Sequence, residues 1–337
     1  MQNTDKILEV KNLNVHFHSS SSIVRAVNGV SFDLNCGESL AIVGESGSGK
    51  SVTATSILGL LPKQTAKIDE GQIIYKNKDL TKKSNRYMRK IRGNEISIIF
   101  QDPMSSLNPV FTIGNQIIEV LRLHQRMSKK QAKKKAVKML QLVGIPEAEK
   151  RIDEYPHEFS GGMRQRVMIA MALSCEPNLL IADEPTTALD VTVQAQILKL
   201  MKDLQNQFNT SIILITHDLG VVWESCEKVL VMYAGNAVEY TSAKRLHEQP
   251  LHPYTWGLLD SRISANHEKQ KKLQPIEGSP PDLNKDLKGC PFAQRCNYAN
   301  GICIEVKPPL VEVEEGHQVA CHFQQKDQRL VREGDYL

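Results

Sequence analysis

The stretch GESGSGKS, residues 44–51, matches the phosphate-loop pattern G-x-x-x-x-G-K-[ST] at every fixed position. It follows a short apolar run, 40–43, that is typical of a buried strand, and it precedes a helix expected to start near Lys50. Glycines leave room for backbone N–H groups to turn toward phosphate oxygens, and the helix start adds a positive dipole. A strand-to-helix turn without a ligand is the alternative. The residues expected to bind a nucleotide are Gly44, Glu45, Ser46, Gly47, Ser48, Gly49, Lys50, Ser51 and Val52.

Within this loop, two side chains have the expected chemistry for a nucleoside triphosphate. Lys50 would reach the β- and γ-phosphates, and the Ser51 hydroxyl would bind Mg²⁺.

The size and composition of the chain are those of an ordinary globular protein. At 337 residues it exceeds the roughly 150 residues of one compact domain, so we expect a large two-lobed α/β domain and a smaller part. The 42 basic and 38 acidic residues nearly balance, which gives no indication of a nucleic-acid partner. No apolar run approaches the roughly 18 residues of a membrane span, and the first residues lack a signal-peptide core, so we expect a cytosolic location.

The first part of the chain reads as an antiparallel β-lobe. Residues 7–17 alternate apolar and polar side chains like an exposed edge strand, and 23–34 resume the pattern after a serine turn. Phe17 ends the first strand, where it could stack on an adenine ring or simply pack as an edge aromatic. A helix is expected over 52–61, and 71–80 reads as a hairpin.

Polar side chains follow three later apolar strands. Gln101 follows 95–100, and Asp183 and Glu184 follow 179–182 in a Walker B pattern. His217 follows 211–216 and could hydrogen-bond a terminal phosphate. Asp183 would hold Mg²⁺ through water, and Glu184 would orient or deprotonate the attacking water. Taken alone, Gln101 reads as a turn residue and His217 as a capping histidine, but together they indicate a parallel sheet with its site along one edge.

The region between these strands is expected to be mainly helical, over about 104–158. Its lysine-rich stretch, 128–145, is most simply a solvated helix face, with acidic lipid or a membrane partner as the alternative. Ser160, Gly161 and Gly162 then open another helix, which makes a second potential phosphate site.

These motifs in this order resemble the ATP-binding cassette of ABC transporters over residues 5–250 or so. The resemblance implies a P-loop NTPase fold with a RecA-like parallel core, an antiparallel β-lobe and a helical subdomain at about 104–164. It also implies a head-to-tail dimer in which Ser160, Gly161 and Gly162 of one copy close over the γ-phosphate held by the other. By the same resemblance, Gln101 senses nucleotide and magnesium and touches membrane subunits, while Asp190 links the two sites.

Further motifs resemble one branch of that family, the ATP-binding subunits of oligopeptide and dipeptide permeases. They are FSGGM followed by RQR from Phe159, HPYTWGLLDS from His252, and IEGSPPDL from Ile276. The resemblance implies a cassette at 1–250 and a C-terminal extension at 251–337. It further implies a peripheral ATPase on the cytoplasmic face, with a second cassette, two transmembrane permeases and an extracellular peptide-binding protein. Nickel or another small solute is the alternative cargo. A soluble cassette acting on ribosomes or DNA, or a non-hydrolysing module, is less favoured.

Four of the seven cysteines crowd into this extension with the spacing C-x5-C-x6-C-x17-C. In a reducing compartment such a set suits metal ligation better than disulfides. Because no C-x2-4-C zinc knuckle occurs, we expect a structural [4Fe-4S] cluster, with zinc or unligated thiols as alternatives. Replacing Cys296 should then leave ATP binding nearly unchanged. The expected ligands are Cys290, Cys296, Cys303 and Cys321.

Overall fold

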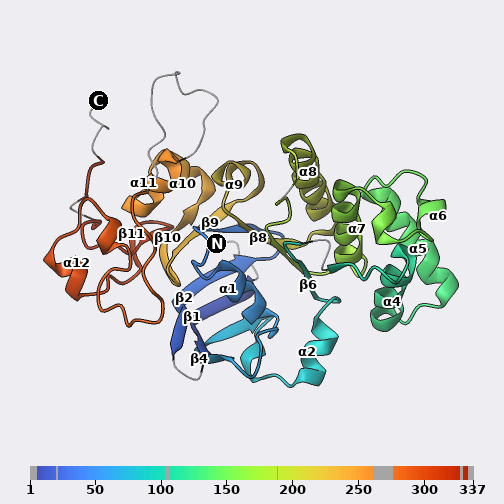
Figure 1. The fold of residues 1–337 in the computed structure, drawn as a ribbon, viewed down its shortest axis with the longest axis horizontal. Helices are drawn as coiled ribbons and strands as arrows, with labels where there is room; N and C mark the ends of the chain where they lie inside the picture. Colours follow the sequence, from blue (N-terminus) through green and yellow to red (C-terminus); the bar gives the residue numbers. More distant parts are fainter. Residues whose placement is uncertain are drawn as a thin grey trace. The chain divides into compact units, whose positions relative to one another are not determined.

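The computed structural model describes residues 6–19, 22–102, 106–187, 189–261, 276–326 and 329–332 (Figure 1). The chain divides into two compact units. The first unit comprises residues 1–8, 34–39 and 82–215, and the second unit comprises 9–33, 40–81 and 216–337.

A four-stranded sheet in the order β2-β1-β4-β5 lies almost wholly in the second unit. The expected edge position of residues 7–17 is wrong, because β1 lies between β2 and β4. Its alternation comes from burying one face, which includes Leu13 and Val15, and not from exposure at an edge. The strands are β1 (Lys6–His18), β2 (Ile23–Asn35), β4 (Ala66–Tyr75) and β5 (Lys78–Asp79).

The hairpin expected over 71–80 is confirmed, since β4 and β5 pair antiparallel. Lys76 and Asn77 both adopt positive φ, 45° and 62°. Two such residues are what a tight two-residue hairpin turn requires.

The other strands of the second unit run in the order β11-β12-β10-β9-β3. β3 is parallel to β9, whereas β10 pairs antiparallel with both β9 and β12. Strands near the end of the chain therefore continue the sheet that carries the phosphate loop. The strands are β3 (Ser39–Val43), β9 (Lys228–Tyr233), β10 (Asn236–Ser242), β11 (Val311–Glu314) and β12 (His317–Val319). The helices are α1 (Lys50–Ile57), α9 (Leu219–Ser225), α10 (Ala243–Glu248), α11 (Pro253–Asp260), η3 (Ala293–Arg295) and α12 (Gly301–Glu305).

Helix α1 ends earlier than the sequence indicates. Gly59 at φ +60° follows the C-cap residue Leu58, and the N–H of Gly59 donates to the Ser56 carbonyl. The N–H of Leu60 donates to the Thr55 carbonyl. This pair of hydrogen bonds around a left-handed glycine stops a helix, so the end lies at Ile57 and not near Pro62.

The first unit contains three parallel strands in the order β8-β7-β6. Every residue of β7 and β8 is buried, which explains their unbroken apolar sequences. The strands are β6 (Ile96–Ile99), β7 (Leu179–Asp183) and β8 (Ser211–Thr216), the last residue of which belongs to the second unit. The helices are η1 (Leu80–Lys82), at the boundary, and α2 (Asn85–Ile91), α4 (Ile113–Gln125), α5 (Lys129–Leu142), α6 (Ala148–Arg151), η2 (Pro156–Glu158), α7 (Gly161–Leu173) and α8 (Val191–Phe208).

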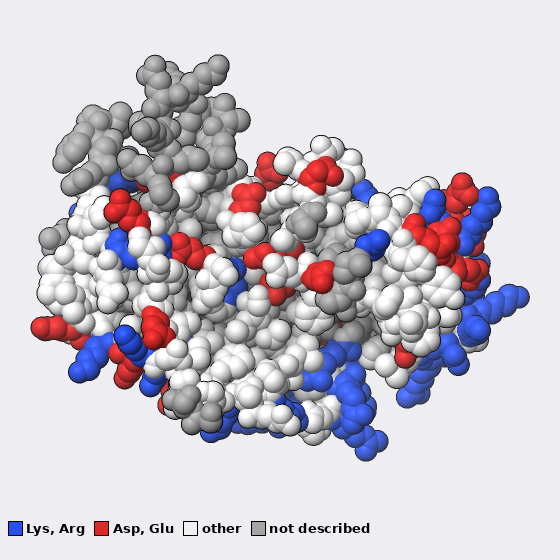
Figure 2. Space-filling view, viewed as in Figure 1, with Lys and Arg blue, Asp and Glu red and all other residues white. Residues whose placement is uncertain are grey.

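Helix α5 presents lysines on one face and apolar residues on the other. Its buried face, which includes Ala136 and Leu140, packs toward α4 and α7. All its lysines except Lys135 are exposed, so the expected solvated face is confirmed. Figure 2 shows basic side chains gathered where α4, α5 and α6 lie in Figure 1.

Among the described residues, the structure has no helix both long and apolar enough for a membrane span.

Candidate functional site

The phosphate loop of the second unit takes a shape that only glycine permits at two positions. Gly44 and Gly49 have φ of +153° and +98°. A Cβ atom on Gly44 would lie 2.1 Å from the Met232 carbonyl oxygen, and one on Gly49 would lie 2.4 Å from that of Ala26. The loop is thus pressed against neighbouring backbone, which fixes where its N–H groups can point.

Polar side chains of the loop are buried around this turn. Lys50, 6% exposed, donates from Nζ to the carbonyls of Gly44, at 2.8 Å, and Glu45, at 2.9 Å. The Ser48 hydroxyl is buried without a hydrogen-bond partner among the described residues. A buried ammonium and an unsatisfied hydroxyl in one glycine-rich loop fit an oxyanion such as phosphate. Ser51 lies exposed in the first turn of α1.

The end of β7, in the first unit, brings three predicted residues close together. Asp183 is the last residue of the strand and is buried. The next residue, Glu184, accepts hydrogen bonds at Oε2 from Gln101 Nε2, at 3.0 Å, and from Thr187 Oγ1, at 2.9 Å. These donors hold one face of the carboxylate. Sequence reasoning missed Thr187, although a hydroxyl three residues after Glu184 was a usable signal.

Glu184 also has a strained backbone. Its φ is +46°, a region that non-glycine residues seldom adopt and that costs about 1–3 kcal/mol. The Glu184 N–H donates to the Ile215 carbonyl at 2.9 Å, which ties the strained residue to β8. Backbone strain of this kind is frequent at functional positions, where Glu184 is predicted to lie.

Two helix starts in the first unit carry the remaining predicted motifs. The Ser160 hydroxyl caps α7 by accepting from the Met163 N–H, and the Asp190 carboxylate caps α8 in the same way. Gly162 faces α8, since a Cβ there would lie 3.0 Å from Val193 Cγ1, and Gly161 is exposed. The exposure of Gly161 gives an external anion access to the start of α7.

The two other predicted nucleotide contacts belong to the second unit. Phe17 is half-buried on β1, and His217 is exposed directly after β8.

The four C-terminal cysteines line one cavity of about 20 Å³. Burial raises the pKa of Cys290 to about 12 and that of Cys321 to about 11. An all-thiol set suits iron or zinc chemically, because buried thiolates need a cation. As placed, however, no group of three or more His, Cys, Asp or Glu side chains in the described ranges is arranged to hold a metal ion.

A buried carboxylate joins this extension to β10. Glu239, fully buried, accepts from the backbone N–H groups of Leu251 and His252 and from the Thr255 hydroxyl, and its Oε1 lies 2.8 Å from His317 Nε2. Burial lowers the pKa of His252 to about 4. The sequence contains no indication of this network, because its members lie far apart in the chain and are not spaced with the period of a helix or a strand.

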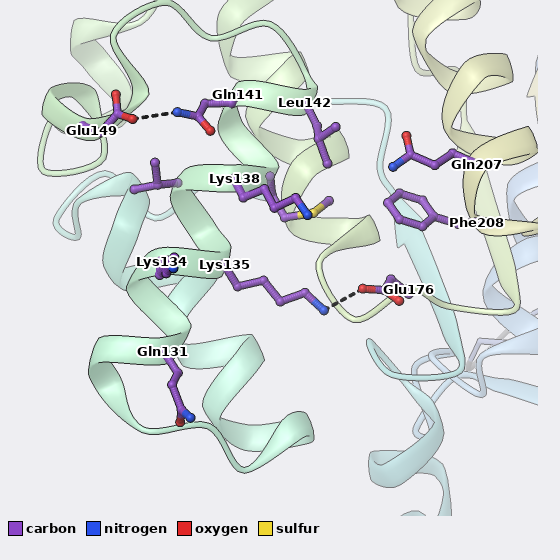
Figure 3. A pocket seen from close by; sticks show the side chains of 12 residues that line it. Gln131, Lys134, Lys135, Lys138, Gln141, Leu142, Glu149, Glu176, Gln207 and Phe208 are labelled. Carbon is purple, nitrogen blue, oxygen red and sulfur yellow. Dashed lines mark hydrogen bonds and ion pairs between the residues drawn. The ribbon is translucent and has the colours of Figure 1, made fainter.

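A separate cavity of about 840 Å³ lies within the first unit, along α5 (Figure 3). Lys135 forms a 2.7 Å ion pair with Glu176, and Gln141 donates to Glu149. None of its twelve lining residues is one that the sequence predicted to bind nucleotide. They are Gln131, Lys134, Lys135, Val137, Lys138, Met139, Gln141, Leu142, Glu149, Glu176, Gln207 and Phe208.

Comparison with known proteins shows to which family this chain belongs. The chain is 54% identical over 334 residues to the dipeptide transport ATP-binding protein DppD of Bacillus subtilis, an alignment covering 98% of this chain and 99% of that one. Family models described as ABC transporter and as oligopeptide/dipeptide transporter, C-terminal region, match residues 27–187 and 238–303. The chain belongs to the ABC transporter family. This ABC protein is also 52% identical to the oligopeptide transport ATP-binding protein OppD of Escherichia coli, over 95% of this chain and 94% of that one.

Solved ABC cassettes share its fold. A dimeric cassette in a post-hydrolysis state, bound to ADP and phosphate, is 29% identical with a TM-score of 0.63 and covers 70% of this chain and 98% of its own. The cassette cbiO1 of Clostridium perfringens is 30% identical with a TM-score of 0.62, over 73% of this chain and 92% of that one. As an ABC ATP-binding subunit, the chain uses ATP and Mg²⁺ and hydrolyses ATP.

Proposed function

We propose that this ABC protein is the ATP-hydrolysing subunit of an importer that carries peptides across the cytoplasmic membrane. The observation that carries the proposal is the match of residues 238–303 to the oligopeptide/dipeptide transporter C-terminal region, beside relatives named for peptide transport along nearly the whole chain. Import of nickel or another small solute is the second candidate, because no residue of an ATPase subunit touches the cargo.

In this proposal the loop of the second unit binds the nucleotide. Backbone N–H groups and Lys50 hold the phosphates, Ser51 and Asp183 hold the magnesium ion, and Phe17 stacks on adenine. Mg²⁺ supplies charge neutralisation at the phosphates when bound. Glu184 accepts a proton from the attacking water or orients it, and His217 hydrogen-bonds the terminal phosphate.

The carboxylate geometry supports the role of Glu184. Gln101 and Thr187 both donate to Oε2. These two hydrogen bonds orient the carboxylate that would act on the attacking water. The hydrogen bond to Glu184 gives Gln101 a direct contact with the proposed catalytic carboxylate, which is consistent with its proposed role in sensing nucleotide.

We infer that catalysis needs a second cassette. Ser160, Gly161 and Gly162 would face the γ-phosphate bound by the partner, and Asp190 would link the two sites. The exposed start of α7 supports this arrangement. The remaining proposed partners are two transmembrane permeases and an extracellular peptide-binding protein, which place this subunit on the cytoplasmic face.

We further propose a cassette at 1–250 and an extension at 251–337 that binds a [4Fe-4S] cluster, with zinc as the alternative. Four thiols lining one cavity support the ligand set. Binding would have to draw the sulfurs together, because as placed they do not surround a common ion. The cluster would stabilise a segment with few large apolar residues.

Two measurements test these proposals. Purification of the chain from solubilised membranes should recover two permeases and a binding protein, and reconstituted vesicles should take up peptide only with Mg·ATP. Uptake of nickel and not peptide would reverse the cargo assignment. Anaerobically purified chain should contain about four irons and four sulfides; colourless protein with stoichiometric zinc would replace the cluster with the alternative.

A further inference from the structure

Every polar group of Glu45, the second residue of the phosphate loop, is bonded. Its N–H donates to the Tyr254 hydroxyl at 2.8 Å, and its carbonyl accepts from Lys50 at 2.9 Å. Its carboxylate receives both terminal nitrogens of Arg295, at 2.7 Å and 3.1 Å. Tyr254 and Arg295 both come from the region after residue 250. The loop is thus held from outside by two side chains of the C-terminal extension.

Arg295 is itself held rigidly. Its side chain is only 5% exposed, against 28% for that of Glu45. It donates from Nε to the Glu277 carbonyl, from NH2 to the Ile276 carbonyl, and from NH1 to the Tyr233 hydroxyl. The hydrogen bonds that Arg295 donates to Glu45 raise the pKa of Arg295, which stays charged. A buried arginine that binds a carboxylate in a bidentate manner holds that carboxylate in place much better than an exposed ion pair does.

The turn that carries Arg295 lies between two of the clustered cysteines. Its N–H donates to the Phe292 carbonyl, Ala293 donates to the Cys290 carbonyl, and Cys296 follows directly. The Phe292 ring lies 5.2 Å from that of Tyr233 and 5.4 Å from that of Tyr254. A packed aromatic group therefore joins the cysteine turn to both residues that contact the loop.

We propose that Arg295 is a positioning residue for nucleotide binding, acting through Glu45 with Tyr254 as a second support. The loop binds phosphate with backbone N–H groups whose directions depend on its exact path, so a support at its second residue controls affinity. The inference rests on the proposed ATP site, and it adds that the extension is part of what shapes that site.

The test is the affinity of the full-length chain for Mg·ATP, measured by calorimetry, with thermal unfolding to check each fold. Arg295→Gln should raise the dissociation constant about tenfold, which corresponds to about 1.4 kcal/mol. Arg295→Lys should recover only part of the loss, because lysine cannot form the paired contact. Glu45→Gln should weaken binding similarly, and the double variant should be no weaker than either single one, because the two residues act as one unit.

Arg329→Ala is the matched control. Arg329 pairs with Glu314 in the same extension and touches no loop residue in the described structure. It should lower the unfolding temperature without changing ATP affinity. Equal affinity in wild type and Arg295→Gln, additive losses in the double variant, or a matching loss in Arg329→Ala would each overturn the inference. Failure of wild-type chain to bind Mg·ATP would instead overturn the proposed ATP site.

Discussion

Gln101 Nε2 lies 3.0 Å from Glu184 Oε2, so a side chain following β6 orients the carboxylate that follows β7. We expect Glu184→Gln to cut Mg²⁺-dependent ATP turnover by about 10² or more, because the group proposed to orient or deprotonate the attacking water is lost. ATP binding should persist, measured by nucleotide retention. Lys50→Ala provides the contrast, since it should weaken binding itself. Turnover at the wild-type rate in Glu184→Gln would disprove the role of that carboxylate.

A second prediction concerns the start of α7. Ser160 caps this helix through the Met163 N–H, so Ser160→Asp should keep the cap and the fold. The added negative charge would repel the γ-phosphate that a partner copy presents. We expect nucleotide affinity of the separate chain to stay unchanged, while ATP-dependent dimerisation, followed by light scattering, is lost. Normal dimerisation of Ser160→Asp would contradict a site composed from two copies.

The third prediction concerns pH. Burial lowers the pKa of His252 to about 4, below its usual value of 6.5, even though Glu239 opposes the shift. The unfolded chain thus binds this proton at higher pH than the folded chain does. The contribution of neutral His252 to stability is fully present above about pH 6.5. As the pH drops from there toward about 4, the free energy of unfolding should fall by up to about 1.4 kcal/mol per pH unit.

The variant His252→Asn isolates this contribution. Asn can still cap α11, where His252 Nδ1 accepts from the Tyr254 N–H, but it does not titrate. Denaturant unfolding of both proteins across pH 4–7 should show a shallower pH dependence in the variant. Because both keep all cysteines, their difference excludes metal release. Parallel curves would show that His252 contributes no pH dependence.

The fourth prediction revises an expectation from sequence. A structural cluster in the extension was expected to leave ATP binding nearly unchanged when Cys296 is replaced, but Arg295, the neighbour of Cys296, holds Glu45 of the loop. Cys296→Ser should therefore weaken Mg·ATP binding several-fold, and it should also remove the iron of the proposed cluster. Cys36→Ser is the control, because Cys36 is exposed in the turn before β3. If the Cys296→Ser variant lacked iron but bound Mg·ATP as tightly as the wild type, the ATP site would be independent of Cys296.

Local patterns were enough to predict much of this molecule. The phosphate loop, the apolar strands around Asp183 and the Ser160 helix start each follow from short-range chemistry: glycine conformations, period and capping. The close approach of Gln101 to Glu184 was also foreseeable, since both follow parallel strands of one sheet.

What sequence could not predict depends on distant pairs. Arg295 and Glu45 are 250 positions apart, and Arg295 reads as an ordinary charged turn residue. The antiparallel pairing of β12 with β10 places His317 beside Glu239, yet a three-residue strand gives no periodic signal. The positive φ of Glu184 is invisible as well, because glutamate has no preference for it.

The buried carboxylate of Glu239 also bears on gene fusion and domain exchange. Its hydrogen-bond partners all follow residue 250, whereas the acid itself lies on β10, before any junction drawn there. A chimaera that grafts another C-terminal segment there, or a stop codon in the same place, strips an interior anion of its partners, at a cost of about 3–5 kcal/mol. We therefore expect recombination between related genes to be tolerated best when the N-terminal half supplies this acid and the C-terminal half supplies its donors.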